Sequence, residues 1–499
     1  MLSDNAKELL SKTYARDGET PEGVFKRVAK VLSIKDEKFE KELYELMING
    51  IFLPNSPAIR NAGIKKMGMS ACFVLPVEDS IAGIYQTLTN MAMVFQRGGG
   101  VGINFSPLRP KDSPLSSGGK SSGAVSFMNL FDATTEVVKS GGFRRGASLF
   151  ALDYDHPDIE EFCQAKLKGR LSNANLSVVV SNDFMKKAIK NKKIDLVHED
   201  KVYDSINCSN ILDLMSFGSW VSGDPGILFF DRINQDNRLL SKGVTIRTTN
   251  PCGEVPLPDF GACCLGSINL SKFVENTSFN MDKFTQTIKL AVRALLHINV
   301  LNYYPLPPVQ RVMRDLNPIG VGVMGFADTL IKLGIYYDSD ECLKFIDDVG
   351  QVLQKVTNDL TPDSFYKRSI APTGALSIIA DCSSGIEPVF SRSYERHITI
   401  GVLREGRELY TSKYCRIAHE IDPVWHLRIQ ARWQKYIDAG VSKTINCSSN
   451  TTVDDIRKLY IEAWKLGCKG VTVFRDRSIN GVYQSINTPT RCEGESCQL

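Results

Sequence analysis

Within five residues, Asn250-Pro251-Cys252-Gly253-Glu254, the chain places three side chains that could act together on one small substrate. Cys252 offers nucleophilic or one-electron chemistry, Glu254 can accept a proton, and Asn250 can hold a hydroxyl group. Pro251 and Gly253 cannot continue a helix or strand, which predicts a tight loop on which these side chains converge. The alternative interpretation of so short a motif is a structural turn that carries a buried cysteine.

The cysteine content favours redox chemistry over metal binding. The chain has 13 cysteines and no apolar signal-peptide core at its start, which argues against a secreted disulfide framework. It has no C-x-x-C pair and no H-E-x-x-H motif, and its 6 histidines are scattered, so no metal site is predicted. Cys492 and Cys497 lie in a polar C-terminal stretch, where a mobile dithiol suits disulfide exchange.

The overall composition is that of a globular protein with a large core. Of 499 residues, 43% are hydrophobic and 23% are charged. A net charge of +4 on this length does not indicate a partner such as DNA or RNA. No uncharged apolar run reaches the roughly 18 residues that a membrane helix needs. We therefore expect a cytoplasmic protein without a membrane partner.

Apolar patterns predict the elements that position the motif. Strand-like runs occur at residues 71–75, 176–180, 226–230, 319–324 and 376–379. They alternate with helical patterns, which favours an α/β architecture with a largely parallel sheet. Residues 1–50 are typical of a small polar helical layer, beginning a helix after Thr20-Pro21. Residues 51–485 show no repeat and indicate one large domain, and residues 486–499 indicate a flexible tail.

Glycine-rich segments offer three candidate ligand sites. Residues 96–104 superficially resemble a dinucleotide-binding fingerprint, but a helical pattern precedes them and a strand pattern follows, the reverse of the Rossmann order. Their glycines are interpreted instead as allowing close approach of the backbone to a ligand. Residues 141–146 place two arginines beside glycines, which suits either a phosphate or a solvated turn. The turn at 371–377 has amides and hydroxyls that could cradle a phosphate.

In their order and spacing, these motifs resemble the catalytic chain of ribonucleotide reductase over nearly the whole sequence, from Asn55-Ser56-Pro57 to the tail. The resemblance implies a ten-stranded α/β barrel, built of two antiparallel five-stranded parallel half-sheets, with a central finger loop. It also implies reduction of ribonucleotides, which we interpret as diphosphates, to 2′-deoxyribonucleotides by thiyl-radical chemistry.

The catalytic roles follow residue by residue from this resemblance. Cys252 matches the thiyl-radical cysteine, and Asn250 and Glu254 match its partners on the ribose hydroxyls. Cys72 and Cys263 match the pair that becomes a disulfide at each turnover.

Other cysteines complete this assignment. Cys492 and Cys497 resemble the tail pair that reduces the active-site disulfide, with thioredoxin or a glutaredoxin-like protein as external reductant. Cys264, next to the reducing pair, is assigned to packing.

Nucleotide-binding residues are implied in the same way. The positions matched to the substrate are Ser56, Ala71, Gly100, Pro372, Thr373, Gly374, Ala375 and Leu376. Ala375 departs from the hydroxyl that is usual in the family, which removes one phosphate contact and leaves the backbone amide to compensate.

A regulatory site is implied as well. Asp79, Ser80 and Arg109 match positions that hold a dNTP or ATP effector at the interface of a homodimer. Residues 111–123 and 166–173 resemble the loops that pass the identity of the effector to the substrate base, and ordinary surface connections are the alternative. We find no counterpart of an ATP-cone domain.

Ribonucleotide reductases are divided into classes by the route through which the radical reaches the catalytic cysteine. Class I catalytic chains receive the radical through two consecutive tyrosines, and the matched residues here are Val473-Phe474, which have no phenol to oxidise. The N-P-C-G-E motif and residues 262–270, A-C-C-L-G-S-I-N-L, resemble class II, in which adenosylcobalamin supplies the radical. No D-x-H-x-x-G motif for cobalamin occurs, and the redox cysteines make class III a poor match.

Two alternatives remain open. One is a class I-like subunit that needs a separate radical-generating protein. The other is a nucleotide-binding regulator without catalysis, against which the survival of the five redox cysteines argues.

Overall fold

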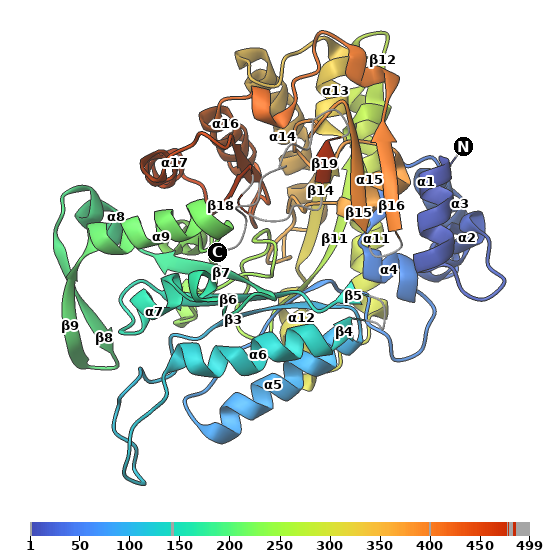
Figure 1. The fold of residues 1–499 in the computed structure, drawn as a ribbon. Helices are drawn as coiled ribbons and strands as arrows, with labels where there is room; N and C mark the ends of the chain where they lie inside the picture. The colour runs from blue at the N-terminus through green and yellow to red at the C-terminus, as the bar shows by residue number, and fades with distance from the viewer. Residues whose placement is uncertain (1, 141–143, 399–400, 477, 479–482, 486–499) are drawn as a thin grey trace.

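The computed structural model describes residues 2–140, 144–398, 401–476, 478 and 483–485, and a mixed sheet of ten strands lies at its centre (Figure 1). Five strands run parallel to one another. In spatial order they are β2 (Cys72–Val74), β3 (Gly100–Asn104), β6 (Ser148–Asp153), β7 (Ala174–Val180) and β10 (Gly226–Phe229). Helices occupy connections between them, as parallel pairing requires.

A second group of strands runs in the opposite direction. It comprises β11 (Ala262–Asn269) parallel to β14 (Ile319–Met324), and β17 (Thr444–Cys447) parallel to β18 (Gly470–Arg475). Two antiparallel pairs, β11 with β2 and β18 with β10, join the two groups. The short β1 (Phe52–Pro54) also pairs antiparallel with β11. The predicted α/β architecture is confirmed, and the antiparallel junctions make the large sheet mixed.

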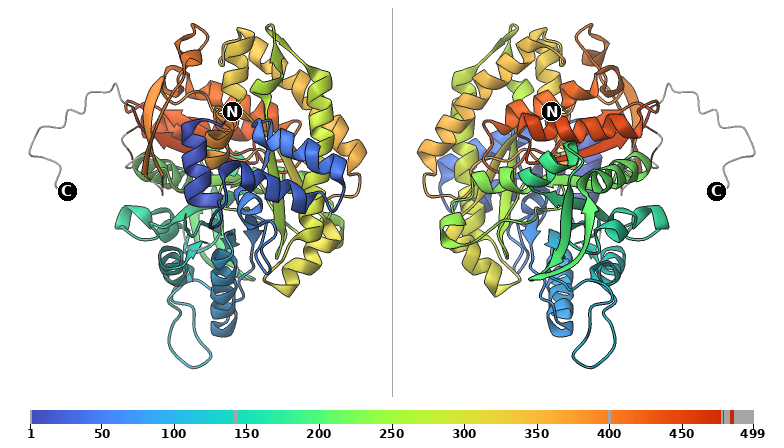
Figure 2. Two further views of the ribbon diagram at one scale, coloured as in Figure 1. Left: turned by 90° about the vertical axis from the view of Figure 1, so that its right-hand side faces the viewer. Right: turned by 90° about the vertical axis from the view of Figure 1, so that its left-hand side faces the viewer.

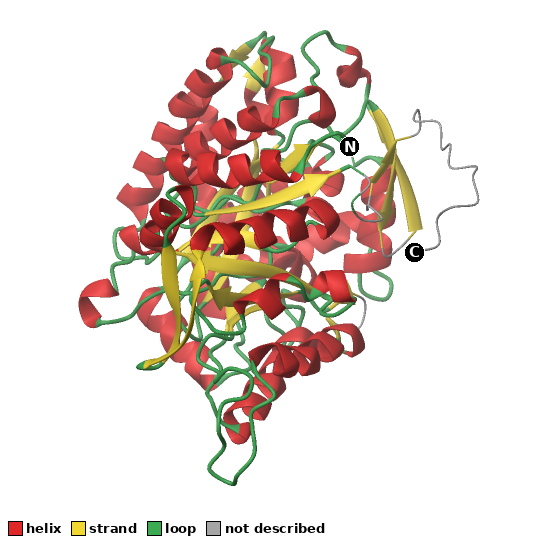
Figure 3. Ribbon diagram, turned by 60° about the vertical axis from the view of Figure 1, so that its left-hand side comes forward, coloured by secondary structure: helices red, strands yellow, loops and turns green. Residues whose placement is uncertain are grey.

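Helices surround this sheet on its outer faces (Figures 1 and 3). They are α5 (Ile81–Gln96), α6 (Ala124–Val137), α7 (Ile159–Cys163), α8 (Asn182–Ile189), α9 (Cys208–Ser222), α10 (Phe230–Gln235), α11 (Met281–Leu301), α12 (Pro307–Leu316), α13 (Phe326–Leu333), α14 (Asp340–Leu360), α15 (Gly374–Ala380), α16 (Pro423–Gln434) and α17 (Val453–Leu466). The order α5 then β3 around residues 96–104 agrees with our rejection of a Rossmann loop.

Small sheets lie at the edges of the molecule. They are β4 (Lys139–Ser140) with β5 (Arg144–Arg145), β8 (Lys193–His198) with β9 (Lys201–Asn207), β12 (Val274–Glu275) with β13 (Ser278–Phe279), and β15 (Ser393–Ile398) with β16 (Gly401–Gly406) and β19 (Tyr483–Ser485). The connection between β3 and α6 projects from the body as a long loop (Figure 2).

N-terminal helices form a layer on one side of the body (Figure 1). They are α1 (Asp4–Leu9), α2 (Pro21–Leu32), α3 (Glu37–Ile48) and the short α4 (Ser56–Asn61). The predicted helix start is confirmed, because Thr20 Oγ1 accepts a hydrogen bond from Gly23 N at 3.1 Å and Pro21 is the first helical residue.

One predicted strand is wrong. Residues 376–379 lie in helix α15, which begins after Thr373 in a left-handed conformation with φ 55°. A short apolar run that is buried on all sides has no periodicity to separate a strand from a helix. Here Gly374 and the turn before it allow a helix to start.

The hydrophobic core is divided by the sheet. Alternate residues of a strand face opposite sides, so Phe73 packs in one large cluster while Cys72 and Val74 belong to a smaller one. This smaller cluster also contains Cys263 and Val255, the residue after Glu254. The fold thus brings the predicted catalytic loop and the predicted reducing pair to the same face of the sheet.

Candidate active site

The motif Asn250–Glu254 forms a tight loop, as predicted. Thr249 pairs with Pro256 across the base of the loop, and Gly253 adopts φ 81°, a conformation that glycine tolerates best. The Glu254 carbonyl accepts hydrogen bonds from Ser369 Oγ at 2.9 Å and from Gly440 N at 2.8 Å. Contacts with distant parts of the chain therefore hold the loop at its C-terminal end.

Strand β3 packs closely against the segment that contains the loop. A Cβ atom at Gly102 would lie 1.7 Å from the Thr249 carbonyl oxygen, and one at Gly100 would lie 3.0 Å from Pro251 Cγ. The glycines of residues 96–104 do permit a close approach, but the approaching group is this loop of the same chain. Glycine is the residue that such contact between two backbone segments requires.

The loop directs its functional side chains to different environments. Cys252 is exposed, whereas Asn250 and Glu254 are 1% and 2% exposed. Asn250 Oδ1 accepts a hydrogen bond from Val255 N at 2.9 Å, and Asn250 Nδ2 donates to Cys72 Sγ at 3.2 Å. The amide therefore connects the loop to the predicted reducing pair.

Cys72 and Cys263 are directly opposite each other in the antiparallel pairing of β2 and β11. Directly opposed residues in such a pair have Cα atoms about 4.5–5.5 Å apart, which is within the range of a disulfide. Burial raises the pKa of both thiols well above the usual value, so both are protonated. The geometry allows these two thiols to be oxidised to a disulfide.

Cys264 points to the other face of β11 and packs in the largest hydrophobic cluster, with its Sγ 3.2 Å from Ser70 Oγ. Strand alternation therefore separates Cys264 from Cys72 and fits the packing role that we expected for it. None of the eleven cysteines within the described residues forms a disulfide.

Glu254 is a buried carboxyl group beside these thiols. Its Oε1 lies 3.8 Å from Cys72 Sγ, and its Oε2 has no hydrogen-bond partner within the described part of the chain. Burial raises the pKa of Glu254 to about 7, against the opposing effect of hydrogen bonds from Asn250 and Cys72. A carboxyl group with this pKa can exchange protons near neutral pH, as a general base requires.

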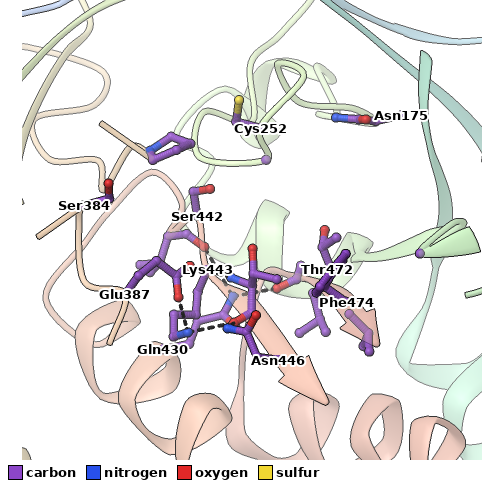
Figure 4. Close-up of a pocket in the computed structure, with 18 of the residues that line it drawn as sticks. Asn175, Cys252, Ser384, Glu387, Gln430, Ser442, Lys443, Asn446, Thr472 and Phe474 are labelled. Carbon is purple, nitrogen blue, oxygen red and sulfur yellow. Dashed lines mark hydrogen bonds and ion pairs between the residues drawn. The ribbon is translucent and has the colours of Figure 1, made fainter. Parts of the chain in front are cut away.

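A cavity of about 500 Å³ opens next to Cys252. Figure 4 shows the Cys252 sulfur on one side of it, and Lys443, Thr472 and Phe474 on the other. The lining also includes Pro372 and Gly374 of the predicted phosphate turn. The volume is in the usual range for small-molecule sites.

Comparison with known proteins identifies the family. Residues 70–359 and 365–474 match the family model "Ribonucleotide reductase, barrel domain", and residues 1–67 match "Ribonucleotide reductase, all-alpha domain". The chain belongs to the ribonucleotide reductase family.

Named relatives refine this comparison. The chain is 39% identical to the vitamin B12-dependent ribonucleoside-diphosphate reductase of Thermoplasma acidophilum, over 96% of the chain and 71% of the relative. It is 34% identical to the protein of the same name from Mycobacterium tuberculosis, over 98% of the chain and 81% of the relative. A solved structure, the Actinobacillus ureae class Id ribonucleotide reductase alpha subunit, shares the fold with a TM-score of 0.79 at 22% identity, covering 95% and 97% of the two chains.

The substrate residues predicted from the reductase resemblance fall into two groups. Pro372 and Gly374 line the Cys252 cavity at the start of α15, and Thr373 Oγ1 accepts a hydrogen bond from Gly385 N at 2.7 Å. Ala375 is half-buried, and Leu376 is buried in the core.

Ser56, Ala71 and Gly100 form the second group and, like Thr373, Ala375 and Leu376, are not among the residues that line the cavity. Ser56, at the start of α4, accepts a hydrogen bond from Tyr14 Oη at 3.0 Å. The Ala71 carbonyl accepts one from Gly100 N at 2.7 Å, which joins the segment before β2 to β3. Ser56, Ala71 and Gly100 therefore form hydrogen bonds within the protein in this conformation.

The predicted effector residues lie together at the start of α5. Arg109 Nε is 2.7 Å from Asp79 Oδ2, and the Arg109 backbone N–H donates to Asp79 Oδ1 at 3.1 Å. Ser80 caps α5, its Oγ accepting from Gly83 N at 3.0 Å. Both side chains of the ion pair remain partly exposed, at 25% for Asp79 and 37% for Arg109.

Helix α7 connects the two predicted specificity loops. Glu161 on this helix lies 3.9 Å from Lys111 Nζ of the first loop and 2.7 Å from Arg170 Nη1 of the second. Lys166, also in the second loop, pairs with Asp224 at 2.5 Å. A shared acidic residue thus joins two segments that are distant in sequence.

Several predicted features cannot be placed. Cys492 and Cys497 lie outside the described residues, as do residues 141–143 of the predicted phosphate segment. Within the described ranges, no group of three or more His, Cys, Asp or Glu residues is arranged to hold a metal ion. A search of the same ranges found no helix with the length and apolarity needed to cross a bilayer.

Sequence reasoning missed two groups at the cavity. Asn175 on β7 donates from Nδ2 to the Pro251 carbonyl at 2.9 Å, directly before Cys252. Lys443, Glu387 and His426 form a buried polar cluster on the opposite wall. A single asparagine in a strand, or a lysine before an apolar run, gives no signal in the sequence that would distinguish it from a surface residue.

We expect Asn175→Ala to lower kcat by up to about 10²-fold, because the Cys252 loop loses the hydrogen bond that holds its tip. Steady-state kinetics should show a change in kcat larger than any change in KM. Asn175→Asp has the same size but no donor, and should behave in the same way. Unchanged kcat with a lowered melting temperature would assign Asn175 a purely structural role.

Proposed function

We propose that this chain is an adenosylcobalamin-dependent ribonucleoside-diphosphate reductase. The observation that carries the proposal is the position of Cys252, exposed to a cavity at which Val473 and Phe474 occupy the positions matched to the tyrosine pair of class I chains. The names of the two relatives above support both the diphosphate substrate and the cobalamin.

The cavity fits one part of the cofactor, its nucleoside arm. Its volume of about 500 Å³ suits a nucleoside, whereas a corrin ring is larger. Phe474 offers an apolar contact, and Glu387 and Asn446 offer polar ones. When bound, adenosylcobalamin supplies the radical equivalent that converts the Cys252 thiol to a thiyl.

The side chains of the loop can then carry the reaction on the ribose. Cys252, as a thiyl, takes the hydrogen atom from C3′, and the Glu254 carboxylate accepts the proton of the 3′-hydroxyl. The 2′-hydroxyl leaves as water with a proton from the Cys72–Cys263 pair. The second thiol of the pair gives its hydrogen atom to C2′, which leaves a 3′-keto group. The two sulfurs then join as a disulfide and pass their extra electron to this keto group, which regenerates the C3′ radical.

The cycle closes on the same residues. Glu254 returns its proton to the 3′ oxygen, and Cys252 returns the hydrogen atom to C3′ and is again a thiyl. The balance is one ribonucleotide and one dithiol converted to one deoxyribonucleotide, one water and one disulfide. The tail pair Cys492–Cys497 would then reduce the disulfide by exchange, with thioredoxin or a glutaredoxin-like protein as the final donor.

We also propose that the sheet closes into a ten-stranded barrel. Isolated parallel bridges support this, because Val321 of β14 pairs with Arg368, and Ile370 pairs with Val441, just before β17. The segment around 368–370 would complete five parallel strands between β11 and β18. The corresponding domains are 1–50, 51–485 and 486–499.

Regulation and assembly are further parts of the proposal. The Asp79–Arg109 pair would open to bind a dNTP or ATP effector, and the loops 111–123 and 166–173 would transmit its identity through Glu161. Exposed apolar side chains on α5, Ile81 at 63% and Tyr85 at 51%, support pairing of two chains across this helix as a homodimer. The eleven described cysteines, none of which is in a disulfide, support a reducing, cytoplasmic location.

The deciding experiment is reduction of CDP by the purified chain alone with dithiothreitol, with and without adenosylcobalamin. We expect dCDP only when cobalamin is present. If CDP and CTP both give no product with cobalamin and effector, while an added radical-generating subunit restores activity, the chain is of the class I type. Nucleotide binding without any turnover would identify a regulator.

A further inference from the structure

A buried ammonium group lies behind one wall of the Cys252 cavity. The Lys443 side chain is 0% exposed and forms an ion pair with Glu387. Its Nζ atom also contacts His426 Nδ1 at 2.8 Å and donates to the Thr444 carbonyl at 2.7 Å. An ammonium group has three protons, so all of them have protein partners. Lys443 has no proton left for a ligand, and its role is to hold its neighbours.

His426 fits this arrangement as a neutral ring. Burial lowers its pKa well below the usual value, and the charge of Lys443 acts in the same direction. Its Nε2 lies 3.3 Å from the Ala418 carbonyl and is placed to donate to it, which leaves the Nδ1 lone pair to accept from Lys443. The imidazole thus fixes the ammonium group from the side away from Glu387.

Glu387 keeps one side open to the cavity. Its side chain is 26% exposed and forms part of the cavity lining together with Cys252 (Figure 4). One carboxylate oxygen accepts from Lys443 and the other accepts from Thr444 N at 2.7 Å. Each oxygen has a further lone pair, so the carboxylate can accept two more hydrogen bonds without moving.

The Glu387 carboxylate lies next to strands β17 and β18. Thr444, which fixes it, pairs with Thr472 across strands β17 and β18, and the next pair along is Ile445 with Val473. Glu387 therefore lies beside the strand segment that the family resemblance matches to the tyrosine pair of class I chains. This part of the wall therefore has a fixed hydrogen-bond acceptor beside the two positions matched to that tyrosine pair.

A fixed carboxylate selects its ligand by charge. It accepts hydrogen bonds from the two neighbouring hydroxyls of a ribose, and it repels phosphate groups. Ribonucleotide substrates and dNTP effectors carry phosphates, whereas the nucleoside arm of adenosylcobalamin carries none. We infer that Glu387 binds the 2′- and 3′-hydroxyls of the 5′-deoxyadenosyl arm of the cofactor, and that Lys443 is the positioning residue for Glu387. This inference rests on the proposed cobalamin dependence.

The test compares binding of two cofactors by equilibrium dialysis: adenosylcobalamin and its 2′,3′-dideoxyadenosyl analogue. The wild-type chain should bind the dideoxy analogue at least about tenfold more weakly, because hydrogen bonds to a charged group are lost. Glu387→Gln should bind the two forms within about threefold of each other. Its affinities for cyanocobalamin, which has no nucleoside arm on that face, and for CDP should equal those of the wild-type chain.

Removing Glu387 alone leaves a buried cation without its partner and could prevent folding. The double variant Glu387→Gln, Lys443→Met removes both charges, and should show the same loss of discrimination between the two cofactors. Thermal unfolding identifies the variant that is folded and suitable for the comparison.

Other results would overturn the inference. If Glu387→Gln, or the folded double variant, keeps the full wild-type preference for adenosylcobalamin, the hydroxyls are bound elsewhere. A loss of CDP affinity instead would assign the carboxylate to the substrate. In both cases the wild-type chain would still reduce CDP with cobalamin, so the proposed function would stand. A wild-type chain that binds no corrinoid and forms no dCDP would overturn the proposed function and this inference together.

Discussion

Cys252→Ser is expected to abolish turnover, with a loss of at least about 10⁴-fold in dCDP formation, and to leave nucleotide binding intact. A serine hydroxyl has nearly the same shape as the thiol but a much stronger bond to hydrogen, so no radical can be generated on it. The side chain is exposed at the tip of its loop, and Ser369 and Gly440 hold the loop through the Glu254 carbonyl. Dialysis with CDP and a chromatographic assay for dCDP measure the two properties separately.

A matched pair of variants controls for the general effect of changing a buried cysteine. Cys263→Ala removes one member of the predicted reducing pair, whereas Cys264→Ala removes its sequence neighbour on the other face of β11. We expect multiple turnovers to stop in the first variant and to continue in the second. Activity of Cys252→Ser near that of the wild-type chain would contradict the proposed mechanism.

How far the sequence predicts this site depends on whether the signal is local. Pro251 fixes its own φ angle and Gly253 permits a positive one, so the loop could be predicted from five residues. The opposite exposure of Cys252 and Glu254 could not, because Ser369 and Gly440, more than a hundred residues away, hold the Glu254 carbonyl. Tertiary contacts of this kind leave no pattern in a single sequence.

The same distinction explains the fold. Residues 319–324 were predicted as a strand and form β14 with these bounds, because β-branched residues alternate with glycines on a sheet buried on both faces. The run at 376–379 has similar composition but forms helix α15, because the turn at Thr373 starts a helix there. The barrel, the residue roles and the cobalamin came from the family resemblance, since composition and periodicity specify only an α/β protein.

The cluster around Lys443 marks the limit of sequence reasoning. A lysine is almost never fully buried without a partner, so a sequence pattern predicts it on the surface. The partners that make burial possible, Glu387 and His426, come from different segments that meet only in the folded chain. Sites built from paired buried charges therefore appear only with the structure.

Glu254→Gln should lower kcat by about 10²–10⁴-fold, because the amide cannot accept the 3′-hydroxyl proton. In the wild-type chain, burial raises the pKa of Glu254 to about 7, so at pH 6 only roughly a tenth of the molecules have the ionised base. The value of kcat/KM should rise with pH and level off above pH 7 to 8. This rise should be absent from the residual activity of Glu254→Gln. Glu254→Asp, which keeps the carboxylate but withdraws it by one methylene group, should retain the rise at a lower rate.

The same substitution should have the opposite effect on stability. A carboxyl group whose pKa is raised on folding stabilises the folded state fully below its unfolded pKa, near 4.5, and this contribution is lost as the pH rises through about 7. At pH 8 the wild-type chain buries a carboxylate at a cost of about 3 kcal/mol, which glutamine avoids. Glu254→Gln should therefore unfold at a higher denaturant concentration than the wild-type chain at pH 8, and at nearly the same concentration at pH 5. A variant that is inactive and less stable at both pH values would indicate that the glutamine disrupts the loop, and the loss of activity could then not be assigned to a missing base.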